Sequence, residues 1–148
     1  MSVPPPRQPV TDALATMLTS ATGHDWFDSD AQWGQSGRWP YGIVEQLPGG
    51  APVGGVIGHP DDMVAVTWQA TAVGRTPAQA HGLMDRARTA ILARDATGAH
   101  THQLPAAPTV VIARRWDTDA GVTLEADVVN VAERFTLILM TDPLHTPG

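Results

Sequence analysis

The sequence predicts an α+β fold in which a mainly antiparallel sheet of about four strands carries two helices packed on one face. Apolar and polar residues alternate over 64–72, which is the pattern of a strand with one buried face. Two other segments repeat apolar residues every three or four positions, which is typical of amphipathic helices. A Gly- and Pro-rich loop between two early strands indicates that these strands pair antiparallel.

The N-terminal part of the chain is expected to be an arm followed by a helix. Residues 1–9 are rich in proline and should form a flexible extended arm, which leaves 10–148 as a single domain. Gly23 is placed to end the first helix as a C-terminal cap. The apolar stripe of this helix consists of Val10, Leu14, Met17, Leu18 and Ala21.

The first two strands are expected over 41–47 and 64–72. The connection between them, 48–60, is rich in glycine and proline and has no apolar period. A long loop of this kind can join two neighbouring antiparallel strands. We therefore expect the two strands to lie side by side.

The second helix is expected to begin at a capped junction. Gly74 lets the chain turn sharply after the strand, and Thr76 is a natural N-cap residue. Pro77 suits the first helical position, and Gln79 can reach back toward the cap. The helix should run over 77–95, with the apolar stripe Ala80, Leu83, Met84, Ala87, Ala90 and Ile91.

Two further strands, over 109–115 and 131–141, are expected to complete the sheet. Between them, 117–121 has the Asp- and Gly-rich composition of a turn. Ile138 and Met140 make the second face of the last strand apolar as well. Such a face is usually covered, so we expect a neighbouring subunit to pack there.

Composition excludes several classes of site and partner. The 148 residues contain no cysteine, which rules out disulfides and thiolate-bound metals. The formal net charge of −6 argues against a protein that wraps duplex DNA. No apolar run approaches the ~20 residues of a membrane span, and the N-terminal sequence does not resemble a secretory signal. We expect synthesis in the cytoplasm and no membrane partner.

Two short patterns invite interpretation as metal sites. Asp117-x-Asp119-x-Gly121 resembles the start of a calcium loop but lacks the later ligands, and Asp and Gly are common turn residues. His100-x-His102 lies in a loop without a matched third ligand. We therefore interpret both as loop segments and expect no metal ligand.

Candidate catalytic groups are equally few. The glycine-rich segment 54–58 precedes a strand instead of following one, and it lacks the lysine of a P-loop. Asp61 and Asp62 stand beside a proline, where acidic residues usually form turns. No G-x-S-x-G pattern occurs. We expect no enzymatic activity, no catalytic residue and no cofactor.

Three tryptophans, Trp26, Trp33 and Trp39, stand in one polar stretch of the chain. They could fold this stretch over the core, anchor a protein partner or stack on sugar rings. All three interpretations remain open at this level. The full set of candidate interface residues is Trp26, Trp33, Trp39, Val53, Ile57, Ile138 and Met140.

Several short blocks within 10–141 carry a family likeness. They are Pro40-Tyr41, Leu47-Pro48-Gly49-Gly50, Gly58-x-Pro60-Asp61, Gln69-x-Thr71-Ala72-Val73-Gly74-Arg75-Thr76-x-x-Gln79-Ala80, Leu83-x-Asp85-Arg86-x-Arg88, Gly121-Val122 and Arg134-Phe135-x-Leu137. In these blocks and in the order of its elements, the chain resembles the tail terminator (tail completion) proteins of long-tailed bacteriophages, above all those of phages that infect actinobacteria. The region 128–130 departs from the family, in which a more polar, proline-containing approach to the last strand is expected.

The resemblance implies a structural subunit of a hexameric ring on the end of the completed tail tube. Such a ring stops tube polymerisation and offers the surface that joins the head. The implied partners are further copies of the chain, the tail tube protein and the head–tail connector protein, with the virion's tail–neck junction as the location after assembly in the host cytoplasm. DNA would pass through the lumen without specific binding, and an acidic lumen would let it slide.

Two alternatives remain open. One is another neck, head–tail connector or tail tube subunit of related fold. The other is a small carbohydrate-binding module that uses Trp26, Trp33 and Trp39, or a small α/β enzyme that uses an aspartate pair.

Overall fold

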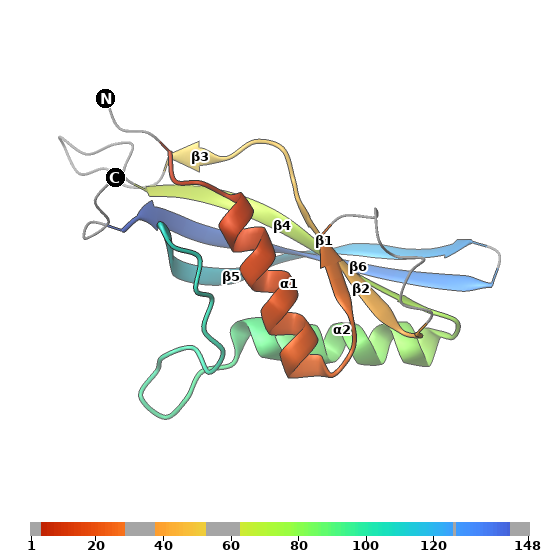
Figure 1. Cartoon of the computed structure of the whole chain (residues 1–148). Helices are drawn as coiled ribbons and strands as arrows, with labels where there is room; N and C mark the ends of the chain where they lie inside the picture. The colour runs from red at the N-terminus through yellow and green to blue at the C-terminus, as the bar shows by residue number, and fades with distance from the viewer. Residues whose placement is uncertain (1–3, 29–37, 53–62, 126, 143–148) are drawn as a thin grey trace.

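The computed structural model describes residues 4–28, 38–52, 63–125 and 127–142. It contains two helices and a six-stranded, mostly antiparallel sheet with the strand order β1-β2-β4-β6-β5, and β3 pairs with β4 beside this path (Figure 1). Among the strand pairs of the described residues, only β1–β2 is parallel. The elements are α1 (Gln8–Thr22), β1 (Trp26–Asp28), β2 (Tyr41–Gln46), β3 (Ala51–Pro52), β4 (Met63–Gly74), α2 (Pro77–Leu92), β5 (Thr109–Glu125) and β6 (Val128–Thr141).

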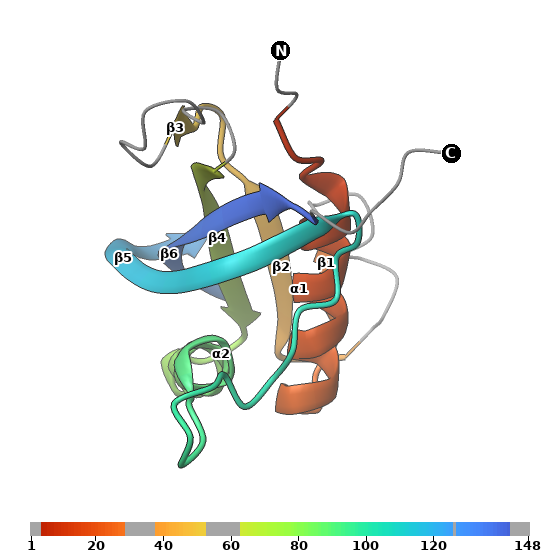
Figure 2. The ribbon, with the colours of Figure 1, turned by 90° about the vertical axis from the view of Figure 1, so that its left-hand side faces the viewer.

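Both helices contribute to one core on one face of the sheet. The two helices cross each other and lie against the sheet (Figures 1 and 2). Alternate residues of β4 from Val64 to Ala72 are buried, and the largest of them, Trp68, lies opposite Phe135 of β6. The buried side chains of α1 and α2 belong to the same cluster. The α+β class predicted from the sequence is thus confirmed.

The sheet has six strands where the sequence predicts about four. The two additional strands are short: β1 has three residues and β3 has two. Segments of this length are too short to show an alternating pattern, so they are defined only by their pairing. The expected antiparallel pairing of β2 with β4 is present, with Tyr41 opposite Val73.

The helix α1 begins at Gln8, so the last two residues of the expected 1–9 arm are helical. Proline is tolerated in the first turn because its missing N–H would have no partner there, and Pro9 occupies this position. Pro5 is buried, and the carbonyl of Pro6 accepts a hydrogen bond from the Thr109 hydroxyl. The helix ends as expected at Gly23, whose φ of 75° lies in the left-handed region.

The junction between β4 and α2 has the expected cap. The Thr76 hydroxyl accepts from the Gln79 N–H at 3.2 Å, and the Gln79 side chain accepts from the Arg75 N–H at 2.9 Å. A Cβ atom at Gly74 would stand 2.9 Å from the backbone nitrogen of Ala80, so the strand and the helix approach too closely for any other residue. The helix α2 ends at Leu92, short of the expected residue 95.

The strand β5 corrects the sequence-based expectation most clearly. The segment 117–121 is not a turn but part of one 17-residue strand whose pairing with β6 extends from Thr109 to Glu125. Register shifts next to Ile112, Asp117 and Ala120 interrupt this pairing. Gly121 has a φ of 101°, and its N–H donates to the Asp119 carboxylate at 2.8 Å. Asp117 and Ala120 are therefore the extra residues of bulges inside a strand, and such bulges increase its twist.

Candidate assembly surfaces

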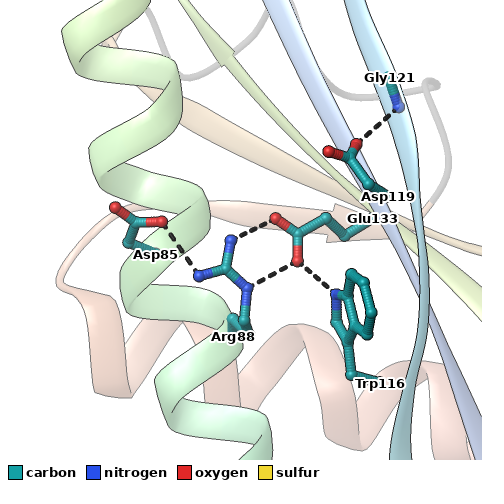
Figure 3. A network of polar contacts seen from close by, with 6 residues as sticks. All are labelled: Asp85, Arg88, Trp116, Asp119, Gly121 and Glu133. Atoms are coloured by element: carbon teal, nitrogen blue, oxygen red, sulfur yellow. Dashed lines mark hydrogen bonds and ion pairs between the residues drawn. The ribbon is translucent and has the colours of Figure 1, made fainter.

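A buried carboxylate joins α2 to the β5–β6 pair. Glu133 of β6 is 4% exposed and accepts two hydrogen bonds from the Arg88 guanidinium, one of them from Nε at 2.7 Å (Figure 3). The Trp116 indole N–H donates to the same carboxylate at 2.8 Å. Arg88 also contacts Asp85 at 3.1 Å. The hydrogen bonds to Glu133 raise the pKa of Arg88 above its ordinary value.

This cluster fixes the position of the edge strand relative to the helix. Arg88 comes from α2, Glu133 from β6 and Trp116 from β5, so three elements meet at one carboxylate. A buried charge is tolerated where it is paired and hydrogen-bonded, as Glu133 is. One signal in the sequence points to it, because Glu133 interrupts the row of inward apolar residues that includes Val131 and Phe135.

The strand β5 carries all the exposed large apolar side chains of the described residues. They are Val110, Ile112, Trp116, Val122 and Leu124, with exposed fractions of 38%, 44%, 44%, 52% and 71%. β5 is also the last strand of the sheet. A sheet edge with exposed apolar groups is a candidate contact surface for another protein.

Charge is distributed unevenly along β5. Its first half contains Arg114 and Arg115, and its second half contains Asp117, Asp119 and Glu125. Arg114 is tied inward, since it donates to the carbonyls of Ile91 and His102, whereas Arg115 is exposed. The strand is therefore positive near its beginning and negative toward its end.

The face of the sheet opposite the helices, here called the outer face, is half-exposed. Its residues include Gln69, Thr71, Arg134, Ile138 and Met140, all of them of intermediate exposure. Arg134 donates to the Gln69 side chain at 3.2 Å. Both apolar residues predicted from the sequence as interface candidates on the last strand, Ile138 and Met140, therefore lie where no described helix packs.

The structure separates the tryptophans that the sequence groups together. Trp26 is 4% exposed, and its indole N–H donates to the Thr22 hydroxyl at 3.1 Å, so it is part of the core. Trp39 is half-buried between the Tyr41 ring, 5.2 Å away, and the Arg75 guanidinium, 5.1 Å away. The remaining candidates, Trp33, Val53 and Ile57, lie outside the described residues.

A groove of about 650 Å³ runs between α1 and the loop that precedes β5. Met17, Ala13 and Pro105 give it apolar walls, and Asp12 and His102 add polar groups. A space of this size with mixed walls could accept a chain segment or a small molecule. This groove could not be predicted from the sequence, because its two walls are far apart along the chain.

The two loop histidines have different surroundings. Neither ring nitrogen of His100 has a hydrogen-bond partner, and burial, followed by the charges of Arg114 and Arg94, lowers the pKa of His100. His102 lies in the wall of the groove instead. Within the described parts of the chain, no three His, Asp or Glu side chains gather in an arrangement that could hold a metal ion.

Neither α1 nor α2 is long and apolar enough to cross a membrane. The chain matches no protein-family model and no curated protein.

Proposed function

We propose that the chain is a structural subunit of a bacteriophage tail, which caps the tail tube as a ring, ends tube polymerisation and forms the surface that joins the head. The most specific support is the sequence block 69–80 that resembles tail terminator proteins. In the structure this block is the β4–α2 junction, where Gly74 permits the close approach and Thr76 caps the helix. The residues of the resemblance thus have a defined architectural role.

The observation that carries the proposal is that the sheet offers surfaces for neighbours. Ile138 and Met140 give the outer face an apolar part that no described helix covers. A ring needs two different surfaces on each subunit, because each copy contacts its two neighbours through opposite sides. The outer face and the sheet edges can supply such surfaces.

The proposed role is structural and involves neither catalysis nor a cofactor. The most deeply buried charged group of the described residues, Glu133, binds Arg88 and Trp116, so it holds three elements together. The buried Thr11 and Thr22 hydroxyls accept hydrogen bonds from tryptophan indoles. These polar contacts stabilise the fold. The net charge of −6 also suits a ring through which DNA slides without binding.

Deletion of the gene from a phage that carries it tests the proposal. We expect headless tails of uncontrolled length in electron micrographs of the lysate, and we expect plasmid-borne wild-type protein to restore normal virions. Tails of normal length with heads attached would overturn the proposal. Filled heads without any tails would favour a connector or tail tube subunit.

A second experiment separates capping from other roles in the neck. Purified chain is added to tubes from the deletion lysate and imaged by negative stain. Density that appears at one tube end and prevents further elongation supports capping. Binding along the whole tube, or no binding, argues against it.

A further inference from the structure

The described chain ends beside the groove that lies between α1 and the loop before β5. This loop runs alongside α1 in both views of the ribbon (Figures 1 and 2). Asp142, the last described residue, donates its backbone N–H to the Pro108 carbonyl at 2.8 Å, and Ala107, the residue before Pro108, belongs to the groove wall. Residues 143–148 of the sequence therefore follow from a point next to the groove.

This point lies near the beginning of α1. Thr141, which precedes Asp142, pairs with Thr109 at the start of β5. The Thr109 hydroxyl in turn donates a hydrogen bond to the carbonyl of Pro6, which stands two residues before α1. The segment 143–148 thus follows from the end of the groove at which α1 begins.

The groove and the segment 143–148 have similar lengths. Along α1 the groove wall extends from Pro9 to Ser20, which is about 16 Å at the rise of an α-helix. Six residues in an extended conformation span about 20 Å. An extended segment can therefore reach from the beginning of α1 to the far end of the groove.

The segment also carries a side chain that suits the groove. Leu144 is its one large apolar residue, and two residues past Asp142 it can reach the apolar wall formed by Ala13 and Met17. Two of the six residues are proline, which restricts the unbound segment and so lowers the entropy lost on binding. Because Ala13 and Met17 are each only 7% exposed, a free peptide of this sequence would gain little apolar contact.

We propose that residues 143–148 bind in the groove of their own chain, with Leu144 packed against Met17. The occupant is the chain's own segment because Asp142 holds it beside the groove, and a short tether raises its effective concentration to the order of millimolar. A weak contact is then sufficient to fill the groove. The inference concerns the isolated subunit, so it goes beyond the proposed function and does not rest on it.

A simpler explanation is that water fills the groove and that residues 143–148 make no preferred contact. This explanation predicts that a reactive group at position 146 meets the groove and the exposed start of β5 about equally often. The proposal predicts a strong preference for the groove. Cross-linking distinguishes the two.

Cysteine cross-linking is well suited to this chain, because the natural sequence contains no cysteine. At the spacings given above, residue 146 reaches the level of Thr16, which is exposed and belongs to the groove wall. Thr16→Cys combined with Thr146→Cys should form a disulfide within one chain under mild oxidation, since a disulfide needs Cα atoms roughly 4.4–6.8 Å apart. Non-reducing electrophoresis and titration of the remaining thiols measure its rate of formation.

Val110→Cys combined with Thr146→Cys is the matched control. Val110 is 38% exposed and lies near the start of β5, opposite Met140, so residue 146 can reach it without entering the groove. The disulfide should form at least about tenfold faster in the pair with Thr16→Cys than in this pair, because binding concentrates residue 146 in the groove.

NMR of the full-length chain, labelled at its methionine methyl groups, gives an independent measurement. Leu144→Ser should shift the Met17 signal, because it removes the side chain that contacts Met17, and it should leave the signal of the fully buried Met84 in place. Leu124→Ser makes the same change at a position of β5 that is 71% exposed, and it should leave the Met17 signal unchanged. Met17→Leu identifies the signal.

The outcomes separate the proposals. Equal disulfide rates for the two cysteine pairs, or an unchanged Met17 signal in Leu144→Ser, overturn the binding of 143–148 in the groove. Disulfides that link two chains through the Thr16→Cys pair also overturn it, and they assign the groove to the segment of a second copy. Normal tails in the gene deletion would overturn the proposed function and leave the groove result unaffected.

Discussion

Trp68 and Thr11, which are 57 positions apart in the chain, are joined by a hydrogen bond of 2.9 Å from the indole Nε1 to the threonine hydroxyl. Both side chains are buried, at 1% and 3% exposure. Trp68 is in the middle of β4 and Thr11 in the first turns of α1. One contact therefore fixes α1 against the central strand of the sheet.

Thr11→Val should lower the free energy of unfolding by about 1–3 kcal/mol, because it leaves the buried indole N–H without an acceptor while keeping the side-chain shape. Urea denaturation followed by tryptophan fluorescence measures the change. Thr16→Val, at an exposed position of the same helix, is the control and should change stability by less than about 0.5 kcal/mol. Equal effects of the two substitutions would show that the hydrogen bond contributes nothing.

Glu133→Gln should destabilise the protein by about 1–3 kcal/mol. The amide keeps the size of the side chain but removes the charge that pairs with Arg88, and the partial exposure of Arg88, 38%, keeps the cost below that of a fully buried pair. The environment of Trp116 should change too, which its fluorescence reports. Asp85→Asn removes the exposed partner of Arg88 and should have a much smaller effect.

Replacement of two glycines near the start of α2 by alanine should change the stability of the protein in opposite directions. Gly74→Ala places a Cβ atom 2.9 Å from the Ala80 backbone nitrogen and should cost about 1–3 kcal/mol. A Cβ atom at Gly82, within α2, would have no atom within 4 Å, so Gly82→Ala should stabilise the protein by about 0.5–1 kcal/mol. Thermal unfolding of both variants checks the pair. A destabilised Gly82→Ala would show that the helix is packed differently at that position.

His100 should make the protein less stable as the solution becomes acidic. Its pKa is lowered in the folded state from an ordinary value of 6.5, so below that pH the unfolded chain takes up a proton that the folded chain does not. Stability should therefore fall as the pH drops from about 7.5 toward the folded pKa. Urea denaturation across this range should show a weaker pH dependence in His100→Gln than in the wild type.

Local sequence patterns predicted the parts of the fold that depend on neighbouring residues. The alternation over 64–72, the cap at Thr76 and the end of α1 at Gly23 are all present in the structure. Each of these features depends on residues that are close together in the sequence. The β1 strand is different, because its three residues are a strand only through their pairing with β2.

The errors arose where distant contacts override local preference. Asp117, Asp119 and Gly121 have the composition of a turn, but Asp119 and Gly121 pair with β6 and Asp117 is the extra residue at a register shift within the strand. Ile138 and Met140 lie on the half-exposed outer face, while Trp26 is in the core. In the cluster around Glu133, the interrupted apolar row points only to Glu133 itself, and its partners Arg88 and Trp116 could not be predicted because they come from two other elements.

The unequal lengths of β5 and β6 bear on the tendency of proteins with open sheet edges to aggregate. β5 uses 17 residues where β6 uses 14, and the surplus sits at the register shifts. A strand with bulges bends and twists more strongly, so its unpaired edge is not straight. Fibrils grow by adding flat, straight strands one after another, and a strongly twisted edge opposes that addition. The bulges of β5 should therefore lower the tendency of its exposed apolar groups to promote fibril growth.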